Sequence, residues 1–250
     1  MRTLVSCFFD ARVNGPFARM ARVLEYSYRH HGDICDVRIS RLSADMRRPR
    51  TGVEAHAHNT QKLEHWVSEA LAMPDGSELI LVDADVMVLR PIADIWEQAF
   101  DVAYTVKAEP LPPSAPFPFN LGVMFLRMSE PVRGLLSAWL RMNADLFAMT
   151  PTDARVWRRT HGGINQAAFG MIVERGALDG LKVLTLPCAE WNCEESAWDT
   201  FDPDRTRIVH VKGELRRELF QACRPKPALE PLIQRWRGLD KAAGQIARTA

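Results

Sequence analysis

The run of large apolar residues at 79–82 constrains the fold most strongly. It follows the turn-forming residues 74–77 and contains no polar residue. A strand without polar alternation is buried on both faces, and such strands belong to parallel sheets that lie between helices. The run therefore predicts an α/β fold, and ligands of such a sheet bind beyond the carboxyl ends of its strands.

Asp83 and Asp85 lie directly behind this run. Carboxylates at this spacing can bind Mg²⁺ or Mn²⁺ and leave coordination positions open for phosphates. A second Asp-x-Asp pair, Asp202 and Asp204, surrounds a proline among polar neighbours and indicates a solvated turn. The competing interpretation of Asp83 and Asp85 is a capped turn in which both accept backbone N–H groups.

The composition limits the chain to one domain and to local phosphate chemistry. With 250 residues, of which 47% are hydrophobic, it suffices for one substantial core. The net charge is +1, from 32 basic and 31 acidic residues, which argues against a nucleic-acid partner. Five scattered cysteines fit free thiols in a reducing compartment.

The amino-terminal apolar stretch at 4–9 is too short for a signal peptide, and no run reaches the ~20 apolar residues of a transmembrane helix. We therefore expect a cytoplasmic protein, with peripheral contact between its basic carboxyl-terminal region and an anionic membrane as an alternative to an ordinary solvated helix face.

Periodicity and turn residues predict alternating strands and helices. We expect a single domain over residues 1–225, with a mixed, mainly parallel sheet flanked by helices, and a helical tail over 226–250 that packs on it. Strands are predicted at 2–9, 34–39, 79–82, 102–106, 119–126, 181–186 and 208–212; helices at 16–31, 57–73, 90–96, 130–147 and 163–174; loops at 41–51 and 110–118; and irregular connections at 148–159 and 187–204.

A second segment supplies candidate ligands. The strand predicted at 208–212 carries His210 and ends at Lys212 and Gly213. Imidazole can complete a site with two carboxylates, a lysine can bind a diphosphate, and glycine permits close approach of the backbone to an anion. The alternative is that His210 is a hydrogen-bonded strand histidine.

Uncharged polar residues occur near the starts of another predicted strand and another predicted helix. Asn120 opens the strand at 119–126, and its amide could bind a sugar hydroxyl; a turn asparagine is the alternative. Asn165 and Gln166 lie at the start of a glycine-led helix, where amides can orient a carbohydrate. Lys62 lies on a helix and could equally be an ordinary exposed lysine.

Taken in order, four segments resemble family 8 glycosyltransferases, the glycogenin-like and bacterial lipopolysaccharide galactosyltransferase-like enzymes of the GT-A fold. They contain Lys62-Leu, the strand with Asp83-Ala-Asp85, Phe119-Asn-Leu-Gly-Val123 and Ile208-Val-His-Val-Lys-Gly213. The resemblance spans about residues 2 to 213. It implies a GT-A catalytic domain and a hexosyltransferase that uses a nucleotide sugar, most simply UDP-glucose or UDP-galactose.

The resemblance also implies roles for individual residues. Asp83, Asp85 and His210 would hold Mn²⁺, or Mg²⁺, against the diphosphate, with Ala84 between the two carboxylates. Lys212 and Gly213 would contact that diphosphate. Ser6, Cys7 and Phe8 would border the uracil, and Lys62 and Asn120 would bind the transferred sugar.

Retention of anomeric configuration is implied as well. No carboxylate nucleophile is evident, so displacement on one face of the sugar is the natural hypothesis, with Gln166 near the anomeric carbon. The family usually has Asp where this chain has Asn165. The amide loses a charge-assisted hydrogen bond to the sugar, which leaves the identity of the nucleotide-sugar donor undetermined.

Two other functions stay open. A sugar-nucleotide-binding module with little catalysis is suggested by Asn165. A sugar-phosphate nucleotidyltransferase is disfavoured because residues 10–15 form only a weak version of the glycine-rich basic loop that it needs. The acceptor is a saccharide, a glycolipid or a protein, and the sequence leaves it and the oligomeric state undetermined.

Overall fold

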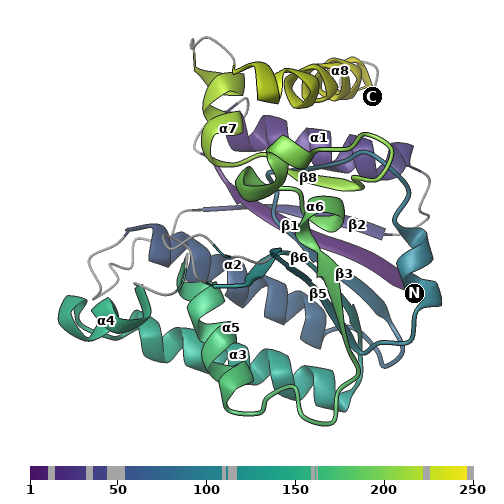
Figure 1. Ribbon diagram of the computed structural model, residues 1–250. Coiled ribbons are helices and arrows are strands. Elements are labelled where there is room, and N and C mark those ends of the chain that lie inside the picture. Colours follow the sequence, from purple (N-terminus) through teal and green to yellow (C-terminus); the bar gives the residue numbers. More distant parts are fainter. Residues whose placement is uncertain are drawn as a thin grey trace.

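The computed structural model describes residues 1–10, 15–31, 36–43, 54–108, 111, 117–158, 161, 163–221 and 226–246. Within these residues, a six-stranded sheet has the order β2-β1-β3-β6-β5-β7 (Figure 1). Its strands are β1 (Arg2–Phe9), β2 (Asp36–Leu42), β3 (Glu78–Val82), β5 (Val102–Val106), β6 (Phe119–Arg127) and β7 (Val183–Pro187).

The sheet is mainly parallel, with β6 as the reversed strand. β1 pairs in parallel with β2 and β3, and β5 pairs in parallel with β7, whereas β6 is antiparallel to both β3 and β5. The amino end of β6 consequently lies beside the carboxyl ends of its neighbours. This arrangement confirms the mixed, mainly parallel α/β fold predicted from the sequence.

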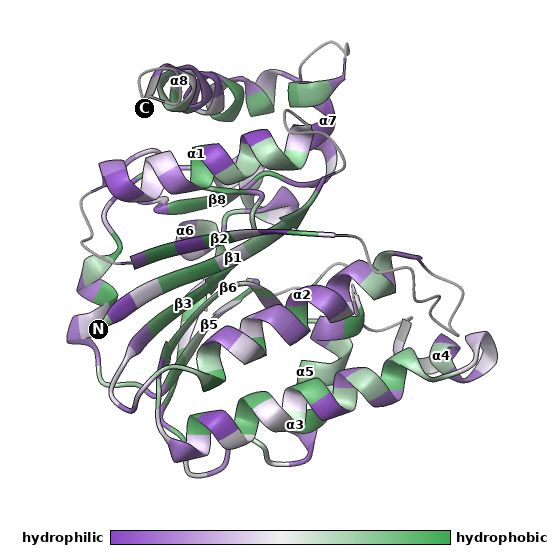
Figure 2. Cartoon of the chain, turned by 180° about the vertical axis from the view of Figure 1, so that it is seen from behind, coloured by the Kyte–Doolittle hydropathy of each residue, from purple (hydrophilic) through white to green (hydrophobic). Residues whose placement is uncertain are grey.

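Helices cover both faces of the sheet (Figure 1). On one face lie α2 (Glu54–Leu71), α3 (Glu130–Phe147) and α5 (Ile164–Glu174); on the other lies α1 (Pro16–His30). The central strand β3 serves both layers: Leu79 and Leu81 pack with the first group of helices, and Ile80 and Val82 pack toward α1. Figure 2 shows green over much of the central strands, in keeping with this two-sided burial.

A second, two-stranded sheet lies above the first. Its strands β4 (Val86–Val88) and β8 (Ile208–His210) are antiparallel, with Val86 opposite His210. The chain thus leaves the large sheet after β3 and enters the small one within a few residues. Asp83 and Asp85 lie in this crossing.

The carboxyl-terminal part is helical. It contains α7 (Gly213–Phe220) and α8 (Glu230–Ile246), joined through the short helix η3 (Pro227–Leu229). Helix α8 packs against α1, where Arg19 of α1 forms an ion pair of 2.5 Å with Asp240. The division into a domain over 1–225 and a tail over 226–250 stays a prediction. No helix among the described residues is both long and apolar enough to cross a membrane.

Several predicted boundaries were wrong. Residues 151–158 form a helix, α4 (Pro151–Arg158), rather than an irregular connection. The sequence signals the start of this helix, because a threonine is followed by a proline. In the structure, the Thr150 hydroxyl accepts the Asp153 N–H at 3.3 Å and the proline occupies the first turn. The predicted irregular stretch at 187–204 contains α6 (Cys188–Trp191) and η2 (Glu195–Thr200), and residues 93–97 form the short helix η1 (Ala93–Glu97).

Strand ends also differ from the prediction. β8 ends at His210 rather than at 212, because Gly213 takes a positive φ of 49° and begins α7. β2 continues to Leu42, paired with Phe9 at the end of β1. Residues 34–35 and most of the loops predicted at 41–51 and 110–118 lie outside the described residues.

We predict that Leu81→Ala lowers the free energy of unfolding by about 2–5 kcal/mol, because the side chain is fully buried in β3 and its removal leaves a cavity. Leu71→Ala is the matched control. Leu71 is 41% exposed at the end of α2, so its truncation should change the free energy by no more than ~0.5 kcal/mol. Urea unfolding of both variants tests this, and equal losses would contradict the two-sided burial of β3.

Candidate functional site

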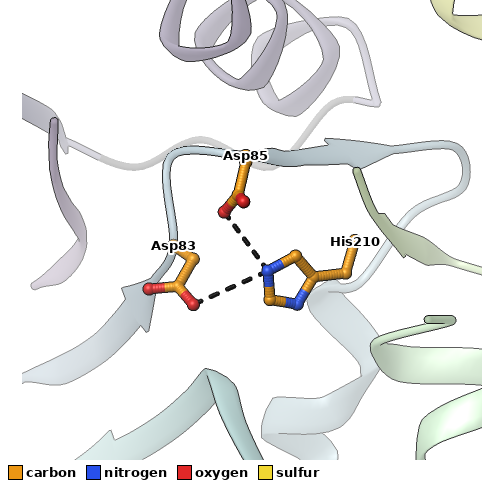
Figure 3. Close-up of side chains that lie close together, drawn as sticks. All are labelled: Asp83, Asp85 and His210. Atoms are coloured by element: carbon orange, nitrogen blue, oxygen red, sulfur yellow. Dashed lines mark ion pairs between the residues drawn. The ribbon is translucent and has the colours of Figure 1, made fainter. Parts of the chain in front are cut away.

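Backbone hydrogen bonds hold Asp83 and Asp85 at the junction of the two sheets. The Asp83 N–H donates to the Gly122 carbonyl at 2.9 Å, and the Val211 N–H donates to the Asp85 carbonyl at 2.6 Å. The first bond ties Asp83 to β6, and the second ties Asp85 to the chain just after β8. His210 therefore lies beside both carboxylates (Figure 3).

The three side chains converge on one point. His210 Nε2 lies 3.7 Å from Asp83 Oδ2 and 3.2 Å from Asp85 Oδ1, and one possible ligand atom from each residue lies within 4.8 Å of the others. Two carboxylates and one imidazole are a donor set that suits Mn²⁺ or Mg²⁺. The residues predicted as metal ligands are thus brought together, and they fit a divalent ion.

Two cations balance the carboxylates. Lys62 Nζ lies 2.5 Å from Asp83 Oδ1, and Arg216 Nη1 lies 3.3 Å from Asp85 Oδ2. Burial opposes ionisation of Asp85, but its interactions with His210 and then with the Arg216 guanidinium outweigh burial and lower the pKa of Asp85 to about 2. Burial likewise lowers the pKa of Lys62, but the charge and hydrogen bond of Asp83 raise it by more.

Arg216 is a site residue that the sequence analysis missed, since it was grouped with the basic carboxyl-terminal region. The available signal was its position in a helix that begins directly after His210. The first turns of that helix lie next to the metal-ligand candidates, and Arg216 contacts Asp85 from there.

A pocket of about 380 Å³ lies on one side of the cluster. Its walls combine aromatic side chains with the ends of β1 and β3. The Phe9 and His58 rings form one part of the wall, with centroids 4.9 Å apart. The lining residues include Cys7, Phe8, Phe9, Phe17, His58, Asn59, Lys62, Asp83, Ala84, Asp85 and Arg216. Ser6 is not among them, because its side chain is fully buried in the sheet.

A second pocket, of about 340 Å³, lies on the other side. It shares Asn59, Lys62, both aspartates and Arg216 with the first, so the carboxylates stand where the two pockets meet. The lining also includes Trp66, Asn120, Leu121, Gly122, Trp139, Asn165, Gln166, His210 and Lys212. Gly213 lines neither pocket.

Asn120 presents an unused donor in the second pocket. Its Oδ1 accepts the Gly122 N–H at 3.2 Å, which identifies the other amide atom as nitrogen. That Nδ2 is buried and has no hydrogen-bond partner among the described residues. A buried polar group without a partner is costly, so a ligand oxygen is the natural complement of this donor.

Asn165 is occupied within the protein. Its Oδ1 accepts from Asn143 Nδ2 at 2.8 Å, and its own Nδ2 donates to the Asn59 carbonyl at 2.8 Å. Thr60 in turn donates to Asn143 Oδ1 at 2.8 Å. These bonds tie α2, α3 and α5 together. The side chain of the neighbouring Gln166, which lines the pocket, forms no hydrogen bond with a described residue.

Lys212 lines the second pocket but is already paired. Its Nζ lies 2.7 Å from Glu194 Oε2, and Lys107 lies 3.6 Å from the other Glu194 oxygen. Burial raises the pKa of Glu194, but Lys212 and then the Ser196 hydroxyl and Lys107 outweigh burial and lower it to about 2. The predicted phosphate-binding lysine is therefore anchored to an ionised carboxylate at the pocket edge.

The similarity of this chain to known proteins lies in its structure. No protein-family model matches the sequence, and no curated protein matches it. Solved structures of glycosyltransferases do match. A glycosyltransferase involved in glycosylation of the major capsid of PBCV-1 aligns with a TM-score of 0.57 and 14% identity, over 87% of this chain and 95% of its own.

Two further solved structures are similar to this chain. The galactosyltransferase LgtC, solved with donor and acceptor sugar analogs, aligns with a TM-score of 0.56 and 12% identity over 96% of this chain and 95% of its own. The glycosyltransferase GlyE of Streptococcus pneumoniae TIGR4 aligns with a TM-score of 0.58 and 14% identity over 96% of this chain and 61% of its own. The chain therefore has the GT-A fold of these glycosyltransferases.

Proposed function

We propose that the chain is a metal-dependent glycosyltransferase. It would transfer a hexose from a nucleoside diphosphate sugar, most simply UDP-glucose or UDP-galactose, to an acceptor hydroxyl with retention of configuration. One observation carries the proposal: Asp83, Asp85 and His210 converge where two pockets meet. A nucleotide sugar has its diphosphate between a nucleoside and a sugar, and this arrangement matches that order.

The first pocket suits the nucleoside. Phe8, Phe9 and His58 offer ring faces and edges for a flat base. Cys7 adds an uncharged wall, because burial raises the pKa of its thiol to about 12. Asn59, which lines both pockets, offers an amide for a base or ribose hydroxyl. The preference for a uridine nucleotide comes from the resemblance to family 8 glycosyltransferases, and the aromatic wall of this pocket is compatible with its base.

The metal cluster and its cations suit the diphosphate. Asp83, Asp85 and His210 would hold Mn²⁺ or Mg²⁺, and the bound ion would stabilise the negative charge that develops on the leaving diphosphate. Once the ion neutralises Asp85, the Arg216 guanidinium is available to a phosphate oxygen. Lys212, which lines the second pocket beside Glu194, would add positive charge there.

The second pocket suits the hexose. Asn120 Nδ2 would donate to a sugar hydroxyl, and Gln166 offers both a donor and an acceptor. Among the described residues, Asp83 and Asp85 are the carboxylates that line this pocket, and both are used as proposed metal ligands. With the retention of configuration that the family resemblance implies, a same-face displacement is the natural hypothesis: the anomeric C–O bond to the diphosphate would break, a bond to the acceptor oxygen would form, and the acceptor proton would pass to a diphosphate oxygen.

Calorimetric titration with UDP in the presence of Mn²⁺, and again in EDTA, tests the proposal. Binding should require the metal, and metal-independent or absent binding would rule out the proposed site. Release of UDP from UDP-hexose without an acceptor then distinguishes a transferase from a binding module. Binding without any turnover, with or without a panel of saccharide acceptors, would favour the binding module.

We predict that Asp85→Asn abolishes Mn²⁺-dependent UDP binding while thermal unfolding remains cooperative, because the amide removes a charged oxygen ligand from the cluster. Asp204→Asn is the matched control, since Asp204 belongs to the second Asp-x-Asp pair and its side chain is 92% exposed. Titration of both variants with Mn²⁺ and UDP measures the difference. Turnover that survives Asp85→Asn would place the metal elsewhere.

We predict that Gly122→Ala lowers Mn²⁺ affinity by about tenfold or more, because a Cβ there would lie 2.7 Å from His210 Cε1 and 3.1 Å from Asp83 Oδ2. Gly134→Ala in α3 is the control, because its Cβ would meet no atom within 4 Å. That substitution should leave the affinity unchanged and stabilise the helix by up to ~1 kcal/mol. Equal affinities in both variants would contradict the close packing of the cluster on Gly122.

We predict that Asn165→Asp lowers the free energy of unfolding by about 1–3 kcal/mol without raising turnover, because the new oxygen would face the Asn59 carbonyl in place of a donor. Gln166→Ala should behave in the opposite way. It should leave stability within ~0.5 kcal/mol and reduce turnover of the donor by about 10- to 100-fold. Faster turnover in Asn165→Asp would show instead that position 165 serves the sugar directly.

A further inference from the structure

Asn192 contacts the metal-ligand histidine from the side opposite the carboxylates. His210 Nδ1 lies 3.1 Å from Asn192 Oδ1, whereas Nε2 faces Asp83 and Asp85. Asn192 is fully buried, and His210 is 5% exposed. Asn192 follows α6, in a stretch that pairs with β8 through the Cys193 carbonyl and the His210 N–H at 2.8 Å.

Two hydrogen bonds fix the orientation of the Asn192 amide. Its Nδ2 lies 3.0 Å from Thr105 Oγ1 and 3.3 Å from the Asn120 carbonyl oxygen. A carbonyl can only accept, so the group that faces it must be the NH₂. The Thr105 hydroxyl donates its single proton to the same carbonyl at 2.5 Å, and it can therefore only accept from Asn192.

The orientation of the amide determines which histidine nitrogen carries a proton. Because the NH₂ group is committed to Thr105 and Asn120, the atom that faces His210 is the oxygen Oδ1, which can only accept. His210 Nδ1 must then be the N–H group. A neutral ring in this state carries its lone pair on Nε2, the nitrogen that faces both carboxylates.

We propose that Asn192 is a positioning residue for the metal site: it holds a proton on Nδ1 of His210 and so presents Nε2 as the ligand. The inference rests on the proposed metal-dependent function. The same amide also bonds the Asn120 carbonyl, and the Asn120 side chain lies in the sugar pocket. Asn192 thus fixes a metal ligand and the backbone of a sugar-binding residue in one buried network.

The test compares two variants of Asn192 that both perturb the network. Asn192→Leu has a similar shape but removes the acceptor, so we expect the proton to leave Nδ1 for Nε2, where it can bond to Asp85. Mn²⁺ affinity should fall by about 10- to 100-fold. Asn192→Asp keeps an acceptor for Nδ1–H but turns an oxygen toward the Asn120 carbonyl. It should lose stability yet keep the proton on Nδ1.

Nitrogen-15 NMR of the imidazole rings in the metal-free protein reads the protonation of each nitrogen, and His210→Gln assigns the signal among the seven histidines. Thermal unfolding reports the structural cost separately. Thr105→Val and Thr105→Ser form a second pair: the valine removes the acceptor of the Asn192 NH₂ and should weaken Mn²⁺ binding, whereas the serine should preserve it.

A bare Nδ1 in the unmodified protein would overturn the inference. So would a proton that stays on Nδ1 in Asn192→Leu, or Mn²⁺ affinity that is unchanged in that variant. Failure of the proposed function is distinguishable, because it would appear as absent Mn²⁺ binding in the unmodified protein, whereas the NMR measurement needs no metal.

Discussion

The antiparallel pairing of β6 with β3 is the constraint on which the site depends. In a fully parallel sheet, the amino end of β6 would lie beside the amino end of β3, far from Asp83. Because β6 is reversed, Asn120 and Gly122 lie beside the carboxyl end of β3, and Gly122 accepts the Asp83 N–H. The absence of a side chain at Gly122 leaves room for the His210 ring. The direction of this one strand thus brings together Asn120, the candidate hydrogen-bond donor to the sugar, the candidate metal ligands and the space between them.

Charge balance explains the residues that surround this edge. Two half-buried carboxylates side by side would be unfavourable without nearby positive charge. Lys62 contacts Asp83, and Arg216 contacts Asp85. Both side chains line both pockets. A divalent ion between the carboxylates would neutralise them in place of the two cations. Lys62 and Arg216 would then be free to bind a diphosphate beside the ion. The arrangement therefore favours binding of the metal and of the diphosphate together.

The sequence alone predicted the parts of the site that depend on local pattern. Asp83, Asp85 and His210 each follow or end a short apolar strand, and the structure brings them together as expected. Asn192 was beyond such reasoning, because its role comes from the packing of the stretch after α6 against β8. Arg216 had only a weak signal, its position in the helix that follows His210. Ser6 shows the opposite failure. The family resemblance implied that it borders the uracil, but its side chain is fully buried and lines neither pocket, whereas Cys7 and Phe8, nearer the carboxyl end of β1, line the first pocket. The helix at 151–158 was missed although Thr150 and Pro151 signal its start.

Two amides show why neutral side chains serve well around this cluster. A carboxylate at position 192 could also accept the His210 Nδ1 proton, and acidic partners of metal-ligand histidines are common. Here, however, the same side chain must also donate to Thr105 and to the Asn120 carbonyl, which only an amide can do. Asn165 meets a similar demand, because it accepts from Asn143 and donates to the Asn59 carbonyl. In both places an acid would set oxygen against oxygen and add negative charge near Asp83 and Asp85. The amide at position 165 is thus suited to its buried network, and in the proposed function sugar recognition would fall to Asn120 and Gln166.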